Sequence, residues 1–478
     1  MRRIFRLLFI VVLLIGLAMI FPLALALAER ESAMAGAFGL TMAGIFALCL
    51  PVIFVTRKQQ IRFSSREGFL LVFLSWASAC LIGALPAFIS GYIPRFSSAL
   101  FESVSGFTTT GASLIADLHS APRSLIFWRG ETHWLGGMGM VVLTVALLPL
   151  LGVGGFQLIK AETTGPEKDR LTPKITETAK LLWIMYIALT ALEAALLRLA
   201  GMDWFDAVCY AFSTLATGGF GSRNESLAAF NSPLIEWIVL SFMIIAGFNF
   251  SLSFRLLKRN FAEVLHNSEA KGYFTIILVS AALIAAALIA RDPAGPGNSI
   301  RQALFFTASI ITTTGFSTGN PNLLPPLAQG VLLILMFVGG CSGSTAGGVK
   351  VVRYVVLFKQ AGNELKKLIY PRGVFSVRLN NKVGRKDVVY GVAGFIFLYF
   401  FLAALGILVT ASAGTDLFSA LNISLASIGN IGLGLGNADP AVILALPAYV
   451  KWFLSFLMIA GRLELWAALV FLSPDYWR

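Results

Sequence analysis

Charged side chains are scarce in this chain of 478 residues. They make up 13% of the sequence, whereas soluble domains carry about 25%. Hydrophobic residues make up 57%, and the mean hydropathy is +0.81. This balance excludes a soluble globular chain and predicts one polytopic membrane domain. The net charge of +13 does not indicate a nucleic-acid partner, because no basic stripe interleaved with exposed aromatic residues is present.

Residues that build metal sites and active sites are also few. The cysteines and histidines are far apart, and no pair has metal-site spacing: Cys49, Cys80, Cys209, Cys341, His119, His133 and His266. We therefore expect buried free cysteines and no metal site. No carboxylate pair or nucleophile with a neighbouring base recurs in the loops, so the sequence does not indicate an enzyme.

Long apolar runs are abundant. Ten are long enough to cross a bilayer, at about 5–28, 36–56, 68–90, 135–155, 178–200, 233–256, 273–290, 327–358, 388–411 and 441–472. The basic start, Met1 to Arg6, resembles a signal sequence. However, the apolar run continues to Ala28 without a clear cleavage site, so we interpret it as a retained first transmembrane helix.

Lysine and arginine lie mostly on one side of these spans. They precede the first span, occupy alternate loops, and are densest between Lys350 and Lys386. The positive-inside rule makes this side cytoplasmic and places both termini there. The basic 350–386 loop is either a topology signal or a docking surface. Four amphipathic segments of about 10 to 13 residues lie in loops of the opposite side, and we predict that they are re-entrant because they are too short to cross.

The four short segments form an internal repeat. Each precedes a glycine, and in three copies an alanine lies twelve residues before it, as Ala99 does before Gly111. The second copy, aligned on Gly218, is shifted by one residue. Threonine precedes the first three glycines, whereas Ile431 precedes Gly432. We therefore predict an all-α protein with four helix–pore loop–helix repeats around a pseudo-fourfold pore, preceded by an extra helix pair.

The repeat gives approximate domain boundaries. The extra N-terminal pair covers 1–66, and the four pore repeats cover 67–160, 161–260, 261–365 and 366–478. Asp203 and Asp416 precede two of the pore helices and are predicted N-caps. Such helices end just before the glycines, so their negative ends point toward a bound cation.

The glycine-bearing turns are candidates for a selectivity filter. Backbone carbonyls from four segments can replace the hydration shell of potassium at one axis. The predicted coordinating residues are Thr109, Thr110, Gly111, Ala216, Thr217, Gly218, Thr313, Thr314, Gly315, Asn430, Ile431 and Gly432. The alternative is that glycine and threonine only allow close helix packing, but packing motifs recur every fourth residue and these glycines occur once per unit.

A glycine-rich stretch, residues 339–350, interrupts the eighth span. It does not match a nucleotide-binding P-loop, because Val349 stands where that motif requires lysine. We predict a broken helix that flexes across the cytoplasmic half of the pore, with a packing kink as the alternative. The candidate gating residues are Gly339, Gly340, Ser342, Gly343, Ser344, Gly347, Gly348, Lys350 and Arg462.

Two charged residues lie within apolar surroundings. Arg462, inside the last span, costs roughly 2.5–3.5 kcal/mol on insertion scales and should face the bundle interior or a cavity. It is either a positive charge near the ion path or a structural ion pair or carbonyl clamp. Glu464 alone is an unsuitable partner, because side chains two apart on a helix do not face each other. Glu102, on the first pore helix, either attracts cations or makes a structural hydrogen bond.

Taken together, these motifs resemble the TrkH-type subunits of the Trk/Ktr/HKT superfamily of potassium transporters. The resemblance covers essentially the whole chain and is most specific at 107–113, 216–220, 312–317, 429–434, 134–139, 339–350 and 461–464. The extra N-terminal helix pair favours the TrkH type over the shorter KtrB type.

The resemblance implies potassium uptake across a bacterial inner membrane, with potassium as substrate and no nucleotide site in this chain. It implies a homodimer in the lipid bilayer, each protomer with its own pore, and a cytoplasmic TrkA-type nucleotide-binding regulatory subunit. It also implies that 339–350 is the gate and that Arg462 lies near it below the filter. In some plant relatives, serine at the first filter glycine accompanies sodium transport, so Gly111 favours potassium. A symporter coupled to protons or sodium is the alternative mechanism.

Overall fold

Most of the chain is helical in the computed structural model. The structure describes residues 2–56, 65–151, 175–291, 295–380, 382–383, 386–432, 435–436 and 439–477. Several predicted features lie outside the described residues: the basic loops 57–64 and 152–174, the end of the 135–155 span, and Leu433 and Gly434 of the fourth motif.

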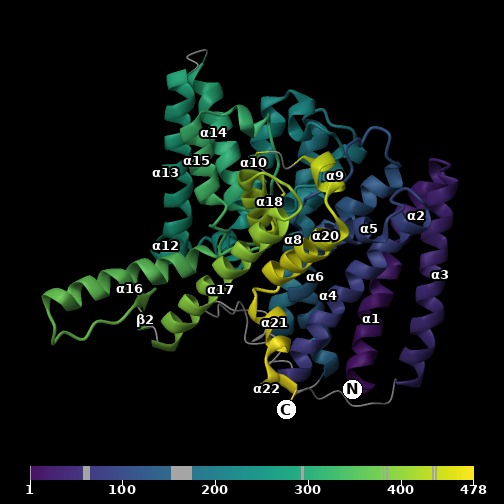
Figure 1. Cartoon of the computed structure of the whole chain (residues 1–478), viewed down its shortest axis with the longest axis horizontal. Helices are drawn as coiled ribbons and strands as arrows, with labels where there is room; N and C mark the ends of the chain where they lie inside the picture. The colour runs from purple at the N-terminus through teal and green to yellow at the C-terminus, as the bar shows by residue number, and fades with distance from the viewer. Residues whose placement is uncertain are drawn as a thin grey trace.

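Long apolar helices form the scaffold. Among the described residues, six helical segments are long and apolar enough to cross a membrane: Phe5–Ala28, Ser32–Val55, Arg66–Ile89, Ala179–Leu199, Ser268–Arg291 and Val388–Ala411. They belong to α1 (Arg2–Ala18) with α2 (Ile20–Ala28), α3 (Ser32–Val55), α4 (Ser65–Ile89), α8 (Ile175–Leu199), α13 (Ser268–Arg291) and α17 (Lys386–Ala411). The chain is therefore a multi-pass membrane protein. Both termini lie at the same end of the molecule (Figure 1).

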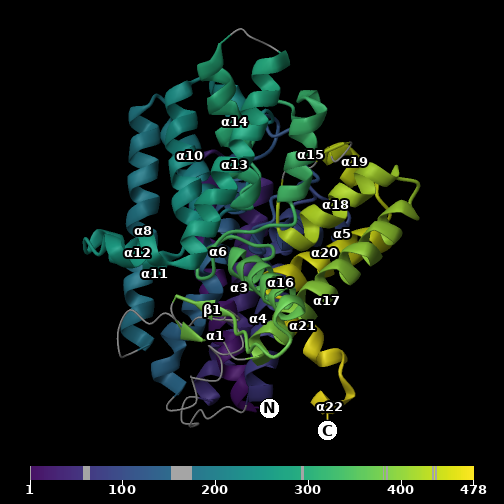
Figure 2. The ribbon, with the colours of Figure 1, turned by 90° about the vertical axis from the view of Figure 1, so that its left-hand side faces the viewer.

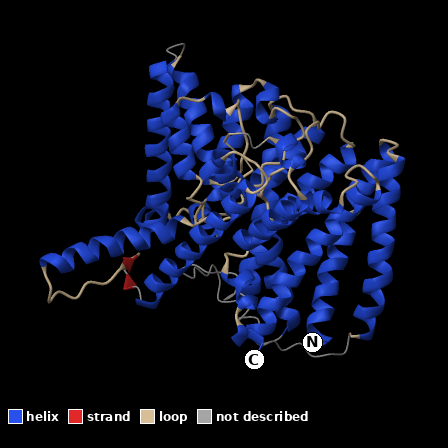
Figure 3. Cartoon of the chain, viewed as in Figure 1, coloured by secondary structure: helices blue, strands red, loops and turns tan. Residues whose placement is uncertain are grey.

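Four short helices lie inside this scaffold. They are α5 (Phe96–Phe107), α9 (Trp204–Leu215), α14 (Pro296–Ile311) and α18 (Leu417–Gly429). Each packs against the helices before and after it, as α5 does between α4 and α6 (Arg123–Leu151). Their C-terminal ends meet irregular loops in the middle of the molecule (Figure 3). As predicted, Asp203 accepts a hydrogen bond from the Asp206 N–H, and Asp416 accepts one from the Ser419 N–H.

The predicted span 233–256 is wrong as one straight helix. It divides into α10 (Pro233–Gly247) and α11 (Phe250–Leu257), which are bent by 110° relative to each other. Phe248 has extended backbone angles, and the Asn249 side chain caps α11 by accepting from the N–H groups of Ser251 and Leu252. A capped start turns the chain, although the run remains apolar.

Two further predicted spans are broken. Within 327–358, α15 (Pro326–Leu335) and α16 (Val351–Ile369) flank the expected interruption. The 441–472 run also divides, into α19 (Pro440–Ala445), α20 (Ala448–Arg462), α21 (Trp466–Leu469) and η4 (Val470–Leu472). Glu464 and Leu465, with φ of 53° and 59°, stop α20 because an α-helix cannot contain left-handed residues.

The remaining elements are short. They are η2 (Ser226–Phe230), α12 (Phe261–His266), η3 (Pro321–Leu323), α22 (Pro474–Trp477), β1 (Arg378–Leu379) and β2 (Lys382–Val383). The two strands pair antiparallel, Arg378 with Val383 and Leu379 with Lys382. The predicted all-α class is confirmed, since each strand of this hairpin has only two residues. The hairpin follows α16, which projects from the bundle (Figures 1 and 2).

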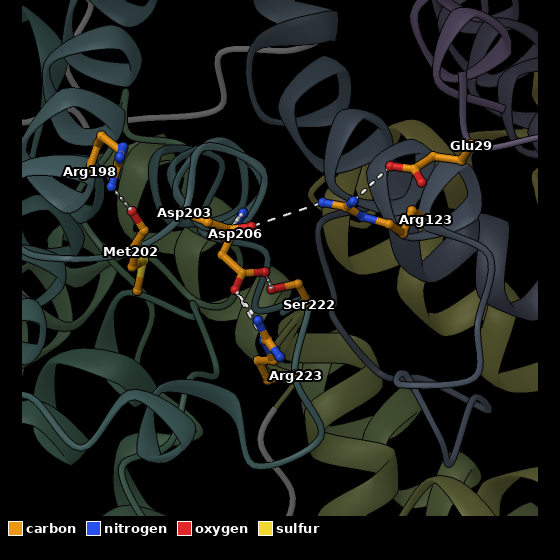
Figure 4. A network of polar contacts seen from close by, with 8 residues as sticks. All are labelled: Glu29, Arg123, Arg198, Met202, Asp203, Asp206, Ser222 and Arg223. Atoms are coloured by element: carbon orange, nitrogen blue, oxygen red, sulfur yellow. Dashed lines mark hydrogen bonds and ion pairs between the residues drawn. The ribbon is translucent and has the colours of Figure 1, made fainter. Parts of the chain in front are cut away.

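The extra N-terminal helices are fastened to the rest at the end opposite the termini. Glu31 accepts hydrogen bonds from the N–H groups of Arg123 and Ser124 at the start of α6, at 2.6 and 3.3 Å. The Arg123 guanidinium donates to Glu29 at 2.7 Å and lies 3.9 Å from Asp203 (Figure 4). One arginine thus connects the extra pair to the segment that begins α9.

Candidate functional site

The four short helices end in the same way. Each is followed or closed by a left-handed residue that is not glycine: Thr109 (φ 52°), Thr217 (φ 55°), Thr313 (φ 56°) and Asn430 (φ 53°). The next N–H in each copy bonds back to the carbonyl five residues earlier, for example Thr110 to Ser105 at 2.9 Å and Ile431 to Ala426 at 2.8 Å. This is the Schellman ending, which turns the chain sharply out of a helix.

This shared ending corrects the predicted register of the second copy. Thr217, and not Ala216, is the counterpart of Thr109, so Gly219 replaces Gly218 as the counterpart of Gly111. Gly111, Gly219 and Gly315 all have positive φ, at 80°, 87° and 82°. Ala207 precedes Gly219 by twelve residues, and the apparent shift disappears. We define the filter segments as 109–111, 217–219, 313–315 and 430–432, numbered one to four.

The filter segments approach one another backbone to backbone. A Cβ on Gly111 would lie 2.0 Å from the Gly218 carbonyl oxygen, and one on Gly219 would lie 2.2 Å from that of Thr314. A Cβ on Gly432 would lie 2.8 Å from the Thr110 carbonyl oxygen. Segment one therefore meets segments two and four, and segment two meets segment three. No side chain other than hydrogen fits at these three glycines.

Side chains of the neighbouring segments support this arrangement. The hydroxyls of Thr108 and Thr110 are 2.8 Å apart, and the same pair recurs as Thr312 and Thr314 at 2.8 Å. The Asn430 amide nitrogen donates to the Thr110 hydroxyl at 3.0 Å, which joins segment four to segment one. These four threonines and Asn430 are fully buried.

Acidic side chains hold the chain just beyond the first two segments. Glu102 accepts from the Ser113 hydroxyl at 2.9 Å, the Leu114 N–H at 2.8 Å and Arg129 Nε at 2.8 Å. Of its two predicted roles, these bonds match the structural one. In the second copy, Asp206 accepts from the Ser222 hydroxyl at 2.6 Å and pairs with Arg223 at 2.7 Å (Figure 4).

His133 contacts two filter regions and was missed by the sequence reasoning. Its Nδ1 lies 2.7 Å from the Gly106 carbonyl oxygen, which can only accept, so Nδ1 carries the hydrogen. Nε2 then accepts from the Phe220 N–H at 3.2 Å. The ring also stacks on Phe220, with centroids 4.1 Å apart. A histidine next to the glycine-rich 134–139 run was the available signal.

The predicted gating segment, 339–350, folds back on itself beneath the short helices. Gly339 N–H donates to the Val349 carbonyl at 2.8 Å, and Val351 N–H donates to the Gly340 carbonyl at 3.1 Å. A left-handed glycine, Gly348 (φ 66°), lies in the turn. The two ends of the segment therefore lie side by side, and its central residues form a closed loop.

The loop contacts the ends of three short helices. The Thr345 hydroxyl donates to the Leu215 carbonyl at 2.9 Å, and the Gly347 N–H donates to the Thr313 hydroxyl at 2.7 Å. A Cβ on Gly347 would lie 2.6 Å from the Gly429 carbonyl oxygen.

The loop also contacts the break between α10 and α11. Gly343 supplies its carbonyl to the Phe250 N–H at 3.1 Å, and the Ser344 hydroxyl bonds the Cys341 carbonyl at 2.6 Å. Within the loop, Lys350 Nζ donates to the Ala346 carbonyl.

Arg462 fastens the loop from α20. Its Nη1 donates to the Thr345 carbonyl at 2.7 Å, and Nη2 donates to the carbonyls of Gly136 and Gly137 at 2.8 and 3.2 Å. The carbonyl-clamp interpretation therefore describes its contacts. Glu464 bonds Arg353 of α16.

Other chemistry is sparse in the part of the chain that the structure describes. The four cysteines are buried and free. No group of three or more histidine, cysteine, aspartate or glutamate residues able to hold a metal lies among these described residues.

The fold and site define a polytopic membrane protein in which four short helices bring backbone turns together beside a loop that Arg462 holds by hydrogen bonds. Comparison with known proteins assigns the family. The model of the TrkH family, described as "Cation transport protein", matches residues 38–291 and 274–478. The chain belongs to this family, and its relatives are transporters.

Individual relatives align over nearly their whole length. The Trk system potassium uptake protein TrkH of Escherichia coli (strain K12) is 38% identical over 491 residues, which cover 100% of this chain and 99% of that protein. The Trk system potassium uptake protein TrkG of the same strain is 34% identical, covering 97% and 96%. The crystal structure of the potassium transporter TrkH from Vibrio parahaemolyticus superposes with a TM-score of 0.88 at 34% identity, covering 100% of this chain and 99% of that chain.

Proposed function

We propose that this chain is the translocation subunit of a Trk-type potassium uptake system and forms a selective, gated pore. The observation that carries the proposal is the convergence of four helix-ending turns, with left-handed Thr109, Thr217, Thr313 and Asn430 at equivalent places. Full-length relatives named potassium uptake proteins support it. The family and these relatives are transporters and not enzymes, which agrees with the proposal.

The filter segments supply the potassium ligands in this proposal. Backbone carbonyls replace the hydration shell of the ion, and the contacts at the glycines set their spacing. The predicted set of coordinating residues is kept, with Gly219 added to the second segment because it is the counterpart of Gly111. Ala216, at the C-cap of α9, then lies one residue before the filter.

The gate in this proposal is the 339–350 loop, held by Arg462. The loop lies against the C-terminal ends of α9, α14 and α18, where an ion leaving the filter must pass. Its glycines allow it to change conformation without steric cost. Conduction then requires the loop to leave these carbonyl and hydroxyl partners.

The setting of the protein is also part of the proposal. The chain lies in the bacterial cytoplasmic membrane with both termini inside, which agrees with the termini sharing one end of the molecule (Figure 1). It forms a homodimer in which each protomer has its own pore, and a cytoplasmic TrkA-type nucleotide-binding subunit regulates it. The units are the helix pair 1–66 and the repeats 67–160, 161–260, 261–365 and 366–478.

Potassium flux into liposomes that contain this chain alone tests the proposal. We expect potassium uptake that sodium competes with only weakly. Replacing Gly111 by serine should reduce that discrimination, because the new Cβ would lie 2.0 Å from the Gly218 carbonyl oxygen. Gly91→Ser is the matched control, since Gly91 also has positive φ (77°) but has no atom within 4 Å of its Cβ position. Equal potassium-to-sodium flux ratios in the two variants would contradict the filter assignment.

Coupled symport with protons or sodium is the second candidate. The observation in its favour is Glu131 of α6, which is 5% exposed and whose Oε2 has no hydrogen-bond partner among the described residues. A buried carboxyl group with an unpartnered oxygen is costly when charged, so it favours binding a proton or cation. A zero-current potential that follows a pH gradient at fixed potassium indicates symport, and one that ignores it indicates a channel-like pore.

A further inference from the structure

Glu269 lies in the first turn of α13, and only 7% of it is exposed. Its Oε1 accepts hydrogen bonds from the Ser342 N–H at 2.6 Å and from the Val352 N–H at 3.3 Å. Ser342 belongs to the first half of the gating segment, whereas Val352 is the second residue of α16, just after the segment ends. One carboxylate oxygen therefore joins the two sides of the loop.

The position of Glu269 is itself fixed. Asn267 caps α13 by accepting from the N–H groups of Glu269 and Ala270, at 2.9 and 3.0 Å. Hydrogen bonds from N–H groups to a carboxylate are charge-assisted and about twice as strong as those between neutral groups. A buried carboxylate that lost these donors would pay a desolvation cost, so the closed loop and Glu269 stabilise each other.

We propose that Glu269 is the positioning residue that latches the gating segment in its closed conformation. The inference rests on the proposed gating function of 339–350 and extends it to a residue on the first helix of the same proposed repeat, 261–365. Arg462 holds the middle of the loop through Thr345, whereas Glu269 holds its two ends together. Opening requires both contacts to break.

The latch is connected to the hairpin that follows α16. Ser268, next to Glu269, donates its N–H to the Asn380 side-chain oxygen at 2.7 Å. Lys359 Nζ donates to the Ser268 hydroxyl at 3.2 Å and to the Arg378 carbonyl at 2.8 Å. A partner that displaces the β1–β2 hairpin therefore pulls on the start of α13. This gives regulation from the predicted cytoplasmic side a physical route to the loop.

Two measurements on Glu269→Ala in liposomes test the latch. Loss of two charge-assisted bonds should raise basal potassium flux about tenfold or more. The amide hydrogens of Ser342 and Val352 should exchange faster, whether or not the protein conducts. Glu269→Gln, which keeps an accepting oxygen without the charge, should give a smaller change of the same sign. Glu263→Ala is the matched control, because Glu263 bonds Asn260, in the turn between α11 and α12, and Arg255 of α11.

The outcomes separate a latch from general support of the fold. If Glu269 is a latch, Glu269→Ala leaves the potassium-to-sodium flux ratio unchanged. Its increase in basal flux also vanishes when residues 342–347 are deleted as well. The inference is overturned if the wild type conducts potassium and both Glu269 variants show the wild-type flux and the wild-type amide exchange. If neither the wild type nor any variant conducts potassium, but the Ser342 and Val352 amide hydrogens exchange faster in Glu269→Ala, the latch is supported and the proposed transport function is rejected.

The hairpin connection has its own pair of variants. Asn380 has φ of 46°, which glycine adopts without strain, so Asn380→Gly removes the side-chain acceptor and keeps the turn. Asn380→Asp keeps an oxygen for the Ser268 N–H. We expect raised flux and faster Ser342 exchange in Asn380→Gly and near wild-type behaviour in Asn380→Asp. Identical behaviour of the two variants would overturn the connection between the hairpin and the latch.

Discussion

Each of the four short helices ends at a left-handed residue, and in all four that residue carries a side chain. A left-handed conformation costs a non-glycine residue about 1–2 kcal/mol, and at two of the four positions the side chain makes contacts that glycine cannot make. At Thr313 the hydroxyl accepts the Gly347 N–H, and at Asn430 the amide reaches Thr110 and the Met458 carbonyl. Thr313 and Asn430 thus join their turns to the loop and to the first candidate filter segment. The Thr217 hydroxyl, in contrast, bonds the adjacent Ala216 carbonyl, and the Thr109 hydroxyl has no partner among the described residues.

His133 is expected to set the spacing between the first two filter segments. Replacing it by leucine leaves the Phe220 N–H and the Gly106 carbonyl without this partner, at a cost of about 1–3 kcal/mol per buried group. His133→Leu should therefore lower the potassium-to-sodium flux ratio in liposomes. His133→Gln should retain the ratio, because an amide offers one donor and one acceptor separated by one carbon, as the neutral imidazole does.

The controls for His133 separate selectivity from folding. His119→Leu alters an exposed histidine in the loop beyond the first filter segment and should leave the ratio unchanged. Protein yield and melting temperature are measured in parallel. If His133→Leu loses stability but keeps the wild-type flux ratio, the residue supports the fold without shaping the filter.

At the scale of elements, apolar length predicted the scaffold well. The spans at 5–28, 36–56, 68–90, 178–200, 273–290 and 388–411 recur among the long helices, because hydrophobicity and length suffice to identify a membrane helix. The break between α10 and α11 was missed, since it depends on one capping side chain, Asn249, inside an unbroken apolar run.

The site was less accessible to sequence reasoning than the scaffold. The repeat identified the glycines of the turns that meet, which remain candidates for a filter, but the second register was wrong because Gly218 and Gly219 are adjacent and only backbone angles tell them apart. Glu269 and His133 act through contacts with residues 73 and 87 positions away. No local pattern marks such partners.

The N-cap of α18 should contribute stability that depends on pH. Hydrogen bonds from the Ser419 side chain and then its N–H lower the pKa of Asp416 below its ordinary value of 3.8. This stabilisation is therefore present above the ordinary aspartate pKa and is lost as the pH falls through the lowered value in the folded protein. Asp416→Ala should melt at a lower temperature than wild type at pH 7, and the difference should shrink at acidic pH.

A neighbouring aspartate provides the control for this cap. Asp439 occupies the N-cap position of α19 but makes no side-chain capping bond there. Asp439→Ala should therefore change the melting temperature in detergent little. A deficit in Asp416→Ala that stays constant from neutral pH to below pH 3.8 would show that the charged carboxylate is not what stabilises α18.

At the scale of the whole molecule, Arg462 joins three of the proposed repeats. It lies at the end of α20 and donates to the carbonyls of Gly136 and Gly137 in α6 and of Thr345 in the loop. A guanidinium suits this position because its fixed donors point in several directions, whereas an ammonium is a single point charge. Glu269 holds the same loop from α13, so contacts from opposite sides keep it beneath the filter.

Replacing Arg462 should therefore release the loop without altering the filter. Arg462→Gln should raise basal potassium flux by about tenfold or more, since hydrogen bonds to a charged donor contribute about 1.5–3 kcal/mol each. The basal flux of Arg462→Lys should lie between those of the wild type and Arg462→Gln, because one ammonium cannot reproduce the three-carbonyl geometry. Arg198→Gln is the control, as Arg198 lies in the last turn of α8 and donates to the Met202 carbonyl at 3.0 Å, away from the loop.

The double variant Arg462→Gln with Glu269→Ala should raise basal flux by less than the product of the two single increases, because the loop is already free after the first change. A multiplicative increase would instead mean that the two residues control separate barriers, and a decrease in flux would mean that Arg462 supports conduction and does not hold the gate closed.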